Sequence, residues 1–436
     1  MSGKTLLVFP RAFEPNHVPP LGISLLGACL RDAGHEVELI DLTVEPMRRI
    51  DLARYGVVGM SLLCTNFPSG TRLARQIRQD NPAICIVAGG PFADKRPGDV
   101  LATGAFDAVA HGEGERVLPA LVSAVARGAD LTGVGGLTLR RDGALVRTPS
   151  PPMIEDLDAL PFPAYDLLDM TRYPRHSVMA SRGCPFGCIF CDRGPAETRR
   201  MRYHSPERVV DWIERMGREF TVLPVRILDS TFTLDQSWAE QICDLILARG
   251  LRVRWHCQTR IDCVNRTLIE KMHRAGCTEL VAGVDSGNDD ILRKSKKSLT
   301  KARARQGAQL FRDGPAPQLH LNFVIGHPWD TRETIAETIS FAEELEDSYG
   351  AKCGYYMMVP FPGTELWDRA SSYEIEITQD WEKYCKLSFT ERPDRLAATF
   401  SSRHLTSDEL TQIYHDIYKR KRARTGRRPA LRTAPP

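Results

Sequence analysis

The sequence predicts an α/β protein with two domains, and three observations support this prediction. The chain has 436 residues, which is too long for one ordinary hydrophobic core. Short apolar runs alternate with stretches of helical periodicity along most of its length, as expected for parallel sheets covered by helices. A proline-rich stretch, "TPSPPMIEDLDALPFPAYDLL" at 148–168, interrupts this pattern and is typical of a linker.

The first predicted domain covers residues 1–147 and contains a parallel sheet between two helical layers. Its predicted strands cover residues 4–10, 35–42, 57–61, 83–91 and 105–115. Its predicted helices cover residues 22–34, 69–80 and 114–127. The run "LRRDGALVR" at 139–147 predicts a hairpin that turns at Asp142 and Gly143.

Small residues gather at the carboxyl ends of three of these strands. They form the pairs Gly59 and Ser61, Gly89 and Gly90, and Gly112 and Gly114. A single glycine of this kind most often makes a tight turn. Three such loops at one edge of a parallel sheet indicate a ligand-binding site at that edge. The ligand is not expected to be a nucleotide, because neither a G-x-G-x-x-G stretch after the first strand nor a Walker A loop is present.

Composition argues against nucleic acid or a membrane as the main partner, since the formal net charge is only +3. No apolar run approaches the roughly 18 residues that a membrane span needs, and "MSGKTLLVFP" lacks a signal-peptide layout. We therefore expect a cytoplasmic protein with reduced cysteines. Nine of the twelve cysteines are scattered and are expected to be buried small hydrophobes. The basic run at 419–432 is expected to be a solvated tail.

The other three cysteines lie together in "SRGCPFGCIFCDRG" at 181–194. Cys184, Cys188 and Cys191 form a C-x3-C-x2-C pattern. A structural zinc site needs a fourth ligand, and neither His204 nor Cys257 belongs to a matching second pair. Three thiolates around a [4Fe-4S] cluster would leave one iron without a protein ligand. Such an open coordination site is available to a substrate.

This loop, with the aromatic Phe190 just before its last cysteine, resembles the signature of radical S-adenosylmethionine (SAM) enzymes. The resemblance implies that the three cysteines bind a [4Fe-4S] cluster whose open iron chelates the amino and carboxylate groups of SAM. It also implies a partial (β/α)6 TIM-type barrel over residues 173–370, after a linker at 148–172. A short helical segment with the basic tail would follow at 371–436.

The pattern after the cysteine loop fits such a barrel. Predicted strands cover residues 177–181, 225–233, 252–260, 277–287, 318–331 and 354–367. Predicted helices cover residues 205–220, 236–250, 265–276, 299–314 and 331–347. Residues 401–424 resemble one further capped helix.

Polar residues follow the predicted strands where a ligand would lie, although some of them are expected to cap the next helix. The stretch "GVDSG" resembles a family segment that contacts SAM, with Asp285 in place of the usual Glu. "FVIGHPWDT" resembles a second segment, whose backbone meets the adenine. The candidate SAM contacts are Asp229, Ser230, Asp285, Ser286 and Gly326. The late aromatic residues Tyr355, Tyr356, Trp381 and Tyr384 are candidates for a substrate pocket, although core packing is the commoner role.

The first domain resembles the flavodoxin-like (Rossmann-like) cobalamin-binding domain that is fused to one branch of radical SAM enzymes, through "PPLGISLLGACLRDAGHEVELIDL", "GGP" and "HGEGE". The resemblance implies cobalamin contacts at Leu62, Leu63, Cys64, Thr65, Asn66, Gly89, Gly90, His111, Gly112 and Glu113. The D-x-H-x-x-G motif, whose histidine binds cobalt from below, is absent. The "SLLCTN" loop at 61–66 is therefore expected at the lower face of the cobalt.

By this resemblance the protein is expected to transfer a methyl group from SAM, through methylcobalamin, to an unactivated carbon of a small metabolite or biosynthetic intermediate. A 5'-deoxyadenosyl radical would abstract the hydrogen atom. We expect a monomer that receives electrons from a carrier such as flavodoxin or ferredoxin. One alternative keeps both cofactors but ends in cyclisation, rearrangement or another non-methylating radical reaction. Another is a zinc-stabilised binding protein without enzyme activity.

Overall fold

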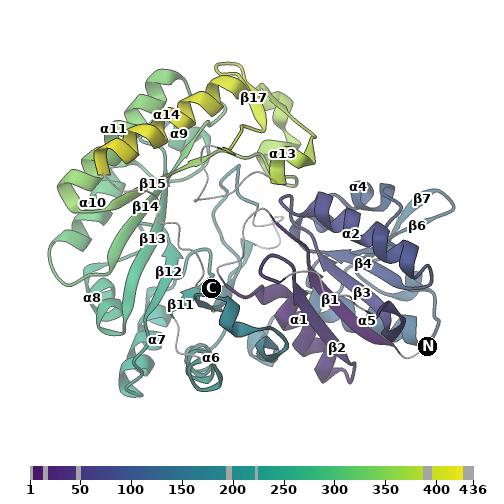
Figure 1. Cartoon of the computed structure of the whole chain (residues 1–436). Coiled ribbons are helices and arrows are strands. Elements are labelled where there is room, and N and C mark those ends of the chain that lie inside the picture. Colours follow the sequence, from purple (N-terminus) through teal and green to yellow (C-terminus); the bar gives the residue numbers. More distant parts are fainter. Residues whose placement is uncertain are drawn as a thin grey trace. The chain divides into compact units, whose positions relative to one another are not determined.

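The computed structural model describes residues 3–12, 18–45, 51–192, 199–220, 224–385 and 395–425. The chain divides into two compact units, each built from several stretches of sequence (Figure 1). The first unit contains Met1–Arg182, Met201–Leu228 and Ala248–Trp255. The second contains Gly183–Arg200, Asp229–Leu247 and His256–Pro436. Among the described residues, no helix combines the length and the apolar character that crossing a membrane requires.

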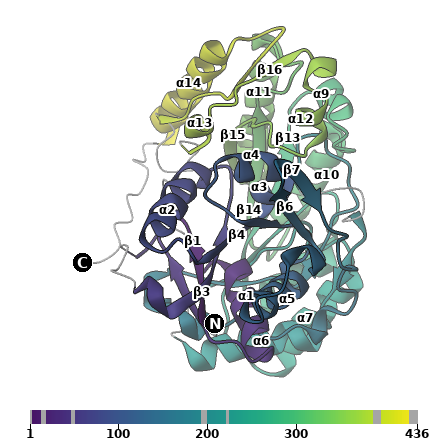
Figure 2. The ribbon, with the colours of Figure 1, turned by 90° about the vertical axis from the view of Figure 1, so that its right-hand side faces the viewer.

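A seven-stranded sheet organises the amino-terminal part of the first unit, in the order β2-β1-β3-β4-β5-β6-β7 (Figures 1 and 2). Its strands are β1 (Lys4–Phe9), β2 (Val37–Asp41), β3 (Tyr55–Ser61), β4 (Cys85–Gly89), β5 (Ala108–Ala110), β6 (Leu137–Arg141) and β7 (Ala144–Arg147). The first five pair in parallel, and β6 and β7 are antiparallel. The order 2-1-3-4-5 is that of doubly wound, flavodoxin-like folds. The predicted parallel sheet is thus confirmed.

Helices cover this sheet as its alternating pattern predicts. They are α1 (Leu21–Asp32), α2 (Phe67–Asp80), α3 (Pro91–Lys95), α4 (Pro97–Ala102) and α5 (Gly114–Ala126), and α1 packs against α5. Leu6, Val58 and Ile86 on the central strands are at most 1% exposed. The predicted hairpin is also present. Asp142 and Gly143 both have positive φ, at 48° and 79°, as a type I′ turn requires.

The proline-rich stretch is irregular, as predicted, but it is packed rather than exposed. The predicted linker at 148–172 contains three short 3-10 turns, η3 (Leu157–Ala159), η4 (Tyr165–Leu167) and η5 (Met170–Arg172). Leu157 and Leu160 share a buried cluster with Leu25 of α1. The Tyr165 hydroxyl donates to the Ser177 carbonyl at 3.0 Å. Its apolar side chains therefore bind this segment to the first unit.

The first unit also contains the beginning of the predicted second domain. Strands β8 (His176–Val178) and β11 (Val225–Ile227) pair in parallel, and β9 (Ser181–Arg182) and β10 (Arg202–Tyr203) form an antiparallel pair. Helix α6 (Pro206–Glu219) begins where the sequence predicts, because the Ser205 hydroxyl accepts the Arg208 amide at 3.1 Å.

The second unit continues the strand and helix alternation. Its strands are β12 (Trp255–Thr259), β13 (Cys277–Asp285), β14 (Gln318–Ile325) and β15 (Lys352–Met357), adjacent in the order β15-β14-β13-β12. Its helices are α7 (Gln236–Ala248), α8 (Arg266–Arg274), α9 (Asp289–Lys294), α10 (Lys301–Arg312) and α11 (Arg332–Tyr349). Each of the six predicted strands has a counterpart, and α9, capped by Asn288, was not predicted.

The segment after β15 contains more structure than the single predicted helix. It comprises α12 (Glu365–Asp368), η7 (Ala370–Tyr373), β16 (Ile375–Ile377), α13 (Trp381–Cys385), β17 (Phe400–Ser402) and α14 (Ser407–Thr425). Helix α14 runs beside α11 (Figure 1), where Arg420 pairs with Glu343 at 3.1 Å. The Tyr414 hydroxyl donates to the Tyr355 carbonyl of strand β15 at 3.0 Å. The end of the predicted basic tail, 426–436, lies outside the described residues.

Candidate active site

The three clustered cysteines lie on an irregular loop between β9 and β10. None of the three cysteines forms a disulfide, all three are half-buried, and the Cys191 amide donates to the Cys188 carbonyl at 3.2 Å. Gly183 begins the loop with a φ of 105°, a left-handed conformation that favours glycine. Burial raises the pKa of the Cys188 thiol to about 11, and the Lys297 ammonium opposes this shift. Bound metal would favour the thiolate instead.

Contacts within the second unit hold the cysteine loop in shape. The Arg260 guanidinium lies 3.9 Å from the centre of the Phe186 ring. The same guanidinium donates to the carbonyls of Lys297 at 2.8 Å and Ser298 at 3.1 Å. Further along the loop, the buried Ile189 donates its amide to the Ser295 carbonyl at 3.2 Å. The loop is therefore tied to segment 295–298 at two points.

Replacing Arg260 with Lys is expected to lower the iron content of reconstituted protein by about 10-fold, the lower end of typical effects of residues that support metal ligands. Lysine keeps the charge but loses the planar fork that contacts Phe186 and two carbonyls together. Iron and sulfide analysis measures the effect. Arg303→Gln is the matched control, because Arg303 also contacts Asp262, at 3.2 Å, but is 55% exposed. Unchanged iron content in Arg260→Lys would contradict this role.

Asp285, the acid of the "GVDSG" stretch, ends β13 in a strained conformation. Its φ is 73°, and the register between β13 and β14 shifts between Gly283 and Asp285. Its Oδ2 lies 2.6 Å from the Lys297 Nζ, and both side chains are at most 10% exposed. Burial alone would lower the pKa of Lys297, but the Asp285 carboxylate raises it overall. A buried ion pair thus stands where the sequence predicts a SAM contact.

The other predicted SAM contacts also belong to the second unit. Asp229 and Ser230 follow β11 after Leu228, and the Asp229 side chain is buried. The Ser286 hydroxyl accepts the amide of Asn288, the N-cap of α9, at 3.1 Å. Gly326 follows β14 with a φ of 96°, and its amide donates to Asp330 at 3.0 Å. The predicted SAM roles of these residues stay predictions.

Two side chains of this site have no role in the sequence interpretation. Lys297 belongs to the run "KSKKSLT", and its charged neighbours are typical of a solvated surface. His327 lies between Gly326 and Pro328, and it is 1% exposed. Only their burial in the folded chain distinguishes them from surface residues.

In the first unit, the predicted cobalamin contacts lie at the carboxyl ends of β3, β4 and β5. The Asn66 side chain accepts the Leu63 amide at 2.7 Å and donates to the Ser61 carbonyl at 3.2 Å. The Leu62 amide donates to the Gly89 carbonyl at 2.7 Å. These bonds join the loop after β3 to β4. Leu63 and Thr65 are half-buried, whereas Leu62, Cys64 and Asn66 are buried.

Glycines make close approach to this edge possible. Gly90 has a φ of 90°, and a Cβ there would lie 2.9 Å from the Leu62 carbonyl oxygen. Gly112 has a φ of 77°, and a Cβ there would have no atom within 4 Å. The backbone at Gly112 is therefore open to a ligand. His111 is buried, its Nδ1 lies 3.0 Å from the Ser150 hydroxyl, and its Nε2 has no partner among the described residues.

Glu113 forms the centre of an ion-pair network in the first unit. One carboxylate oxygen accepts from Arg182 at 2.8 Å and Arg202 at 2.9 Å. The other accepts from Arg202 at 3.0 Å and from the Ile154 amide at 2.6 Å. Burial alone would raise the pKa of Glu113, but these hydrogen bonds hold it below its usual value. The carboxylate is thus fully engaged, and its predicted cobalamin contact stays a prediction.

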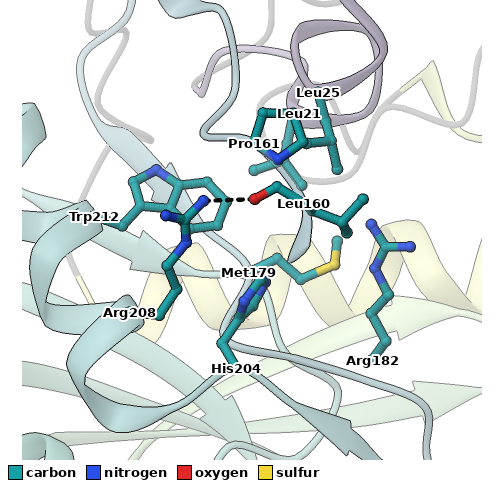
Figure 3. A pocket seen from close by; sticks show the side chains of 9 residues that line it. All are labelled: Leu21, Leu25, Leu160, Pro161, Met179, Arg182, His204, Arg208 and Trp212. Atoms are coloured by element: carbon teal, nitrogen blue, oxygen red, sulfur yellow. Dashed lines mark hydrogen bonds between the residues drawn. The ribbon is translucent and has the colours of Figure 1, made fainter. Parts of the chain in front are cut away.

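A small cavity lies beside this network (Figure 3). Its volume is about 10 Å³, which is room for about one water molecule, so it does not fit a metabolite. It is lined by Leu21, Leu25, Leu160, Pro161, Met179, Arg182, His204, Arg208 and Trp212. Arg208 closes one side by donating to the Leu160 carbonyl at 2.6 Å.

The residues that a zinc site would recruit are engaged elsewhere. The His204 Nδ1 lies 2.9 Å from the Asp158 carboxylate. Cys257 is fully buried, and burial raises the pKa of its thiol well above the usual value. Within the described ranges, no three His, Cys, Asp or Glu side chains are grouped to hold a single metal ion.

Comparisons with known proteins match both halves of the chain. Residues 15–122 match the family model of the B12 binding domain, and residues 178–342 match that of the radical SAM superfamily. An uncharacterised methyltransferase of Pyrococcus horikoshii is 30% identical over 414 residues, which cover 92% of this chain and 87% of that protein. The anaerobic magnesium-protoporphyrin IX monomethyl ester cyclase of Synechocystis is 28% identical over 313 residues, which cover 68% of this chain and 62% of the cyclase.

Among solved structures, the fold is similar to that of TsrM from Kitasatospora setae, a radical SAM methyltransferase with cobalamin and a [4Fe-4S] cluster bound. The TM-score is 0.73 at 22% sequence identity, and the match covers 87% of this chain and 81% of that chain. The similarity extends over both predicted domains. The fold that the sequence predicts is therefore confirmed at the level of its two α/β parts.

Proposed function

The chain belongs to the radical SAM superfamily and carries a B12-binding domain, and on this premise we propose that it is a cobalamin-dependent methyltransferase. Its target is an unactivated carbon of a small molecule. The observation that carries the proposal is the cysteine loop, which contacts Arg260 through Phe186 and places Cys184, Cys188 and Cys191, all half-buried, within eight residues. This donor set fits a [4Fe-4S] cluster with one open iron.

The chain's own residues bind, orient and shield the cofactors. Cys184, Cys188 and Cys191 hold the cluster, and Ile189, which is 1% exposed, excludes water behind it. When bound, the cluster and SAM supply a 5'-deoxyadenosyl radical, and cobalamin supplies the methyl group. Asp229, Ser230, Asp285, Ser286 and Gly326 are assigned to the SAM side of the site.

Cobalamin is assigned to the edge formed by the ends of β3, β4 and β5. Leu63 and Thr65 are the half-buried members of the loop after β3, so we place them at the lower face of the corrin. Because a Cβ at Gly112 would have no atom within 4 Å, there is room for the corrin ring to approach the Gly112 backbone. The Glu113 carboxylate already accepts hydrogen bonds from Arg182, Arg202 and the Ile154 amide. We therefore assign it the role of holding the loop that follows β5 in place. A flavodoxin or ferredoxin would supply electrons to a cytoplasmic monomer.

A second candidate function keeps both cofactors but ends in a radical cyclisation or rearrangement. The similarity to the magnesium-protoporphyrin cyclase favours it. The two candidates differ in the fate of the SAM methyl group. Methylation consumes one SAM by polar transfer, which leaves S-adenosylhomocysteine, whereas radical cleavage leaves 5'-deoxyadenosine.

We expect anaerobically reconstituted protein, given cobalamin, a reductant and SAM with a labelled methyl group, to release S-adenosylhomocysteine. The label should appear in the cobalamin fraction on chromatography. Protein reconstituted without cobalamin is the control and should release none. If the complete mixture forms 5'-deoxyadenosine but no S-adenosylhomocysteine, the methyltransferase proposal fails and the non-methylating reaction is favoured.

A further inference from the structure

A second, larger cavity lies at the amino-terminal ends of β8 and β11 in the first unit. Its volume is about 270 Å³, roughly the room of nine water molecules, and it opens to solvent. His176 and Val225, which begin these two strands, line it and are buried. The predicted SAM contacts Asp229 and Ser230 follow the other end of β11. Because catalytic groups of parallel α/β sheets gather at the carboxyl ends of the strands, this cavity is separate from the proposed active site.

Aliphatic side chains form much of the cavity wall. Ile213 of α6 and Val225 of β11 are buried. Leu251 and Val253, in the segment that precedes β12, are half-buried. Such a wall favours an aliphatic group, because binding removes apolar surface of both partners from water.

Gly217 leaves room beside this wall. It lies within helix α6 and lines the cavity, at a position where glycine is less favourable than alanine. A Cβ at Gly217 would have no atom within 4 Å, so packing does not exclude a side chain there. Neither the helical backbone nor the surrounding atoms require glycine. A larger side chain at this position would occupy part of the open space.

The cavity also carries positive charge where it meets solvent. Arg218 and Arg252 line it and are exposed, and Arg252 has no ion pair within the ranges that the structure describes. Glu214 is the acidic residue of the lining, but Arg249 lies 3.1 Å from its carboxylate and Arg218 lies 3.4 Å from it. An anion in the cavity would therefore meet an uncompensated guanidinium at Arg252. The planar guanidinium fork matches a carboxylate.

We propose that this cavity binds a medium-chain aliphatic carboxylate, with the chain against the aliphatic wall and the carboxylate at Arg218 and Arg252. Pockets for drug-sized ligands usually have about 300 to 1,000 Å³, so a cavity of about 270 Å³ fits a smaller molecule such as octanoate. The inference is independent of the proposed function. Among the described residues that line the cavity, none is a cluster cysteine or a predicted cofactor contact.

The test measures dissociation constants by calorimetry on the full chain, with octanoate and its neutral analogue octanamide as ligands. Wild-type protein should bind octanoate about 10-fold more tightly, because only the carboxylate forms charge-assisted hydrogen bonds. Arg252→Gln should bind the two ligands equally. Gly217→Leu should weaken the binding of both by about 10-fold or more, because leucine takes up space that the chain needs.

Arg254→Gln is the matched control. Arg254 is also exposed and lies two residues from Arg252, but it is not among the residues that line the cavity. This variant should keep the wild-type preference for octanoate.

Three results would overturn the inference. They are wild-type protein that binds neither ligand or binds both equally, an undiminished preference in Arg252→Gln, and undiminished octanoate binding in Gly217→Leu. Thermal unfolding checks that the variants fold, and the exposed Arg252→Gln keeps the test decisive if Gly217→Leu does not. None of these results bears on the proposed function, which the products formed from SAM decide.

Discussion

Protein carrying Cys188→Ala is expected to lose its iron and all cleavage of SAM. Three thiolates bind three irons of the proposed cluster. With only two thiolates, a second iron has no protein ligand, and the cluster is not retained. Cys188 also lies in a held part of the loop, because its neighbour Ile189 is buried and its amide donates to the Ser295 carbonyl. Activity should therefore fall by more than about 100-fold, beyond the usual effect of residues that only support a metal ligand.

Iron analysis and chromatography of 5'-deoxyadenosine measure this loss. Cys85→Ala is a suitable control, because Cys85 is likewise a free, half-buried cysteine but begins strand β4 of the amino-terminal sheet. The control should keep wild-type iron content. Retained SAM cleavage in Cys188→Ala would refute the assignment of this cysteine as a ligand.

The second large effect is expected at Glu113. Glu113→Gln should reduce the free energy of unfolding by about 3 kcal/mol, because it leaves Arg202 buried without its counter-charge, whereas Arg182 keeps its second partner, Glu115, at 2.5 Å. The Arg202 side chain is only 6% exposed and that of Glu113 is 18% exposed, so water cannot replace the lost carboxylate. Denaturant unfolding of the metal-free protein measures the difference.

An exposed pair of the same unit provides the control. Arg31 and Asp166 lie 2.7 Å apart, but their side chains are 42% and 56% exposed. Asp166→Asn should therefore change stability by less than about 1 kcal/mol. Equal, small effects of the two substitutions would show that the Glu113 network does not stabilise the fold.

The same network predicts a dependence of stability on pH. The folded-state pKa of Glu113 is held below its usual value of 4.5, so the stabilisation is complete above that value. It is lost as the pH falls through the lower, folded-state pKa. Wild-type protein should consequently lose stability more steeply than Glu113→Gln below about pH 4.5.

Local sequence patterns predict most of the fold and the cluster ligands. The alternation of strands and helices depends on neighbouring residues, so β1 to β5 and the strands after the cysteine loop could be located. The C-x3-C-x2-C spacing likewise lies within eight residues. The proline-rich stretch is different, because the burial of Leu157 and Leu160 depends on α1, far away in the sequence. Helix α9 is too short for a clear periodic pattern.

Long-range contacts explain what sequence interpretation missed in the site. The sequence predicts a cobalamin contact at Glu113, but it does not reveal the ion pairs of Glu113 with Arg182 and Arg202, which lie 69 and 89 residues away. Lys297 belongs to a charged run, and only the folded chain brings it to Asp285. The burial of His327 likewise depends on the surroundings of its ring. Such features follow from tertiary packing, which a single sequence does not encode locally.

The central claim is that Cys184, Cys188 and Cys191 hold an iron-sulfur cube with one iron open to SAM. Mössbauer spectroscopy of protein reconstituted anaerobically with iron-57 tests it most directly. The spectrum should contain the signal of a [4Fe-4S] cluster, and one iron site should change when SAM is added. A preparation without this signal, with zinc in place of iron, would contradict the claim.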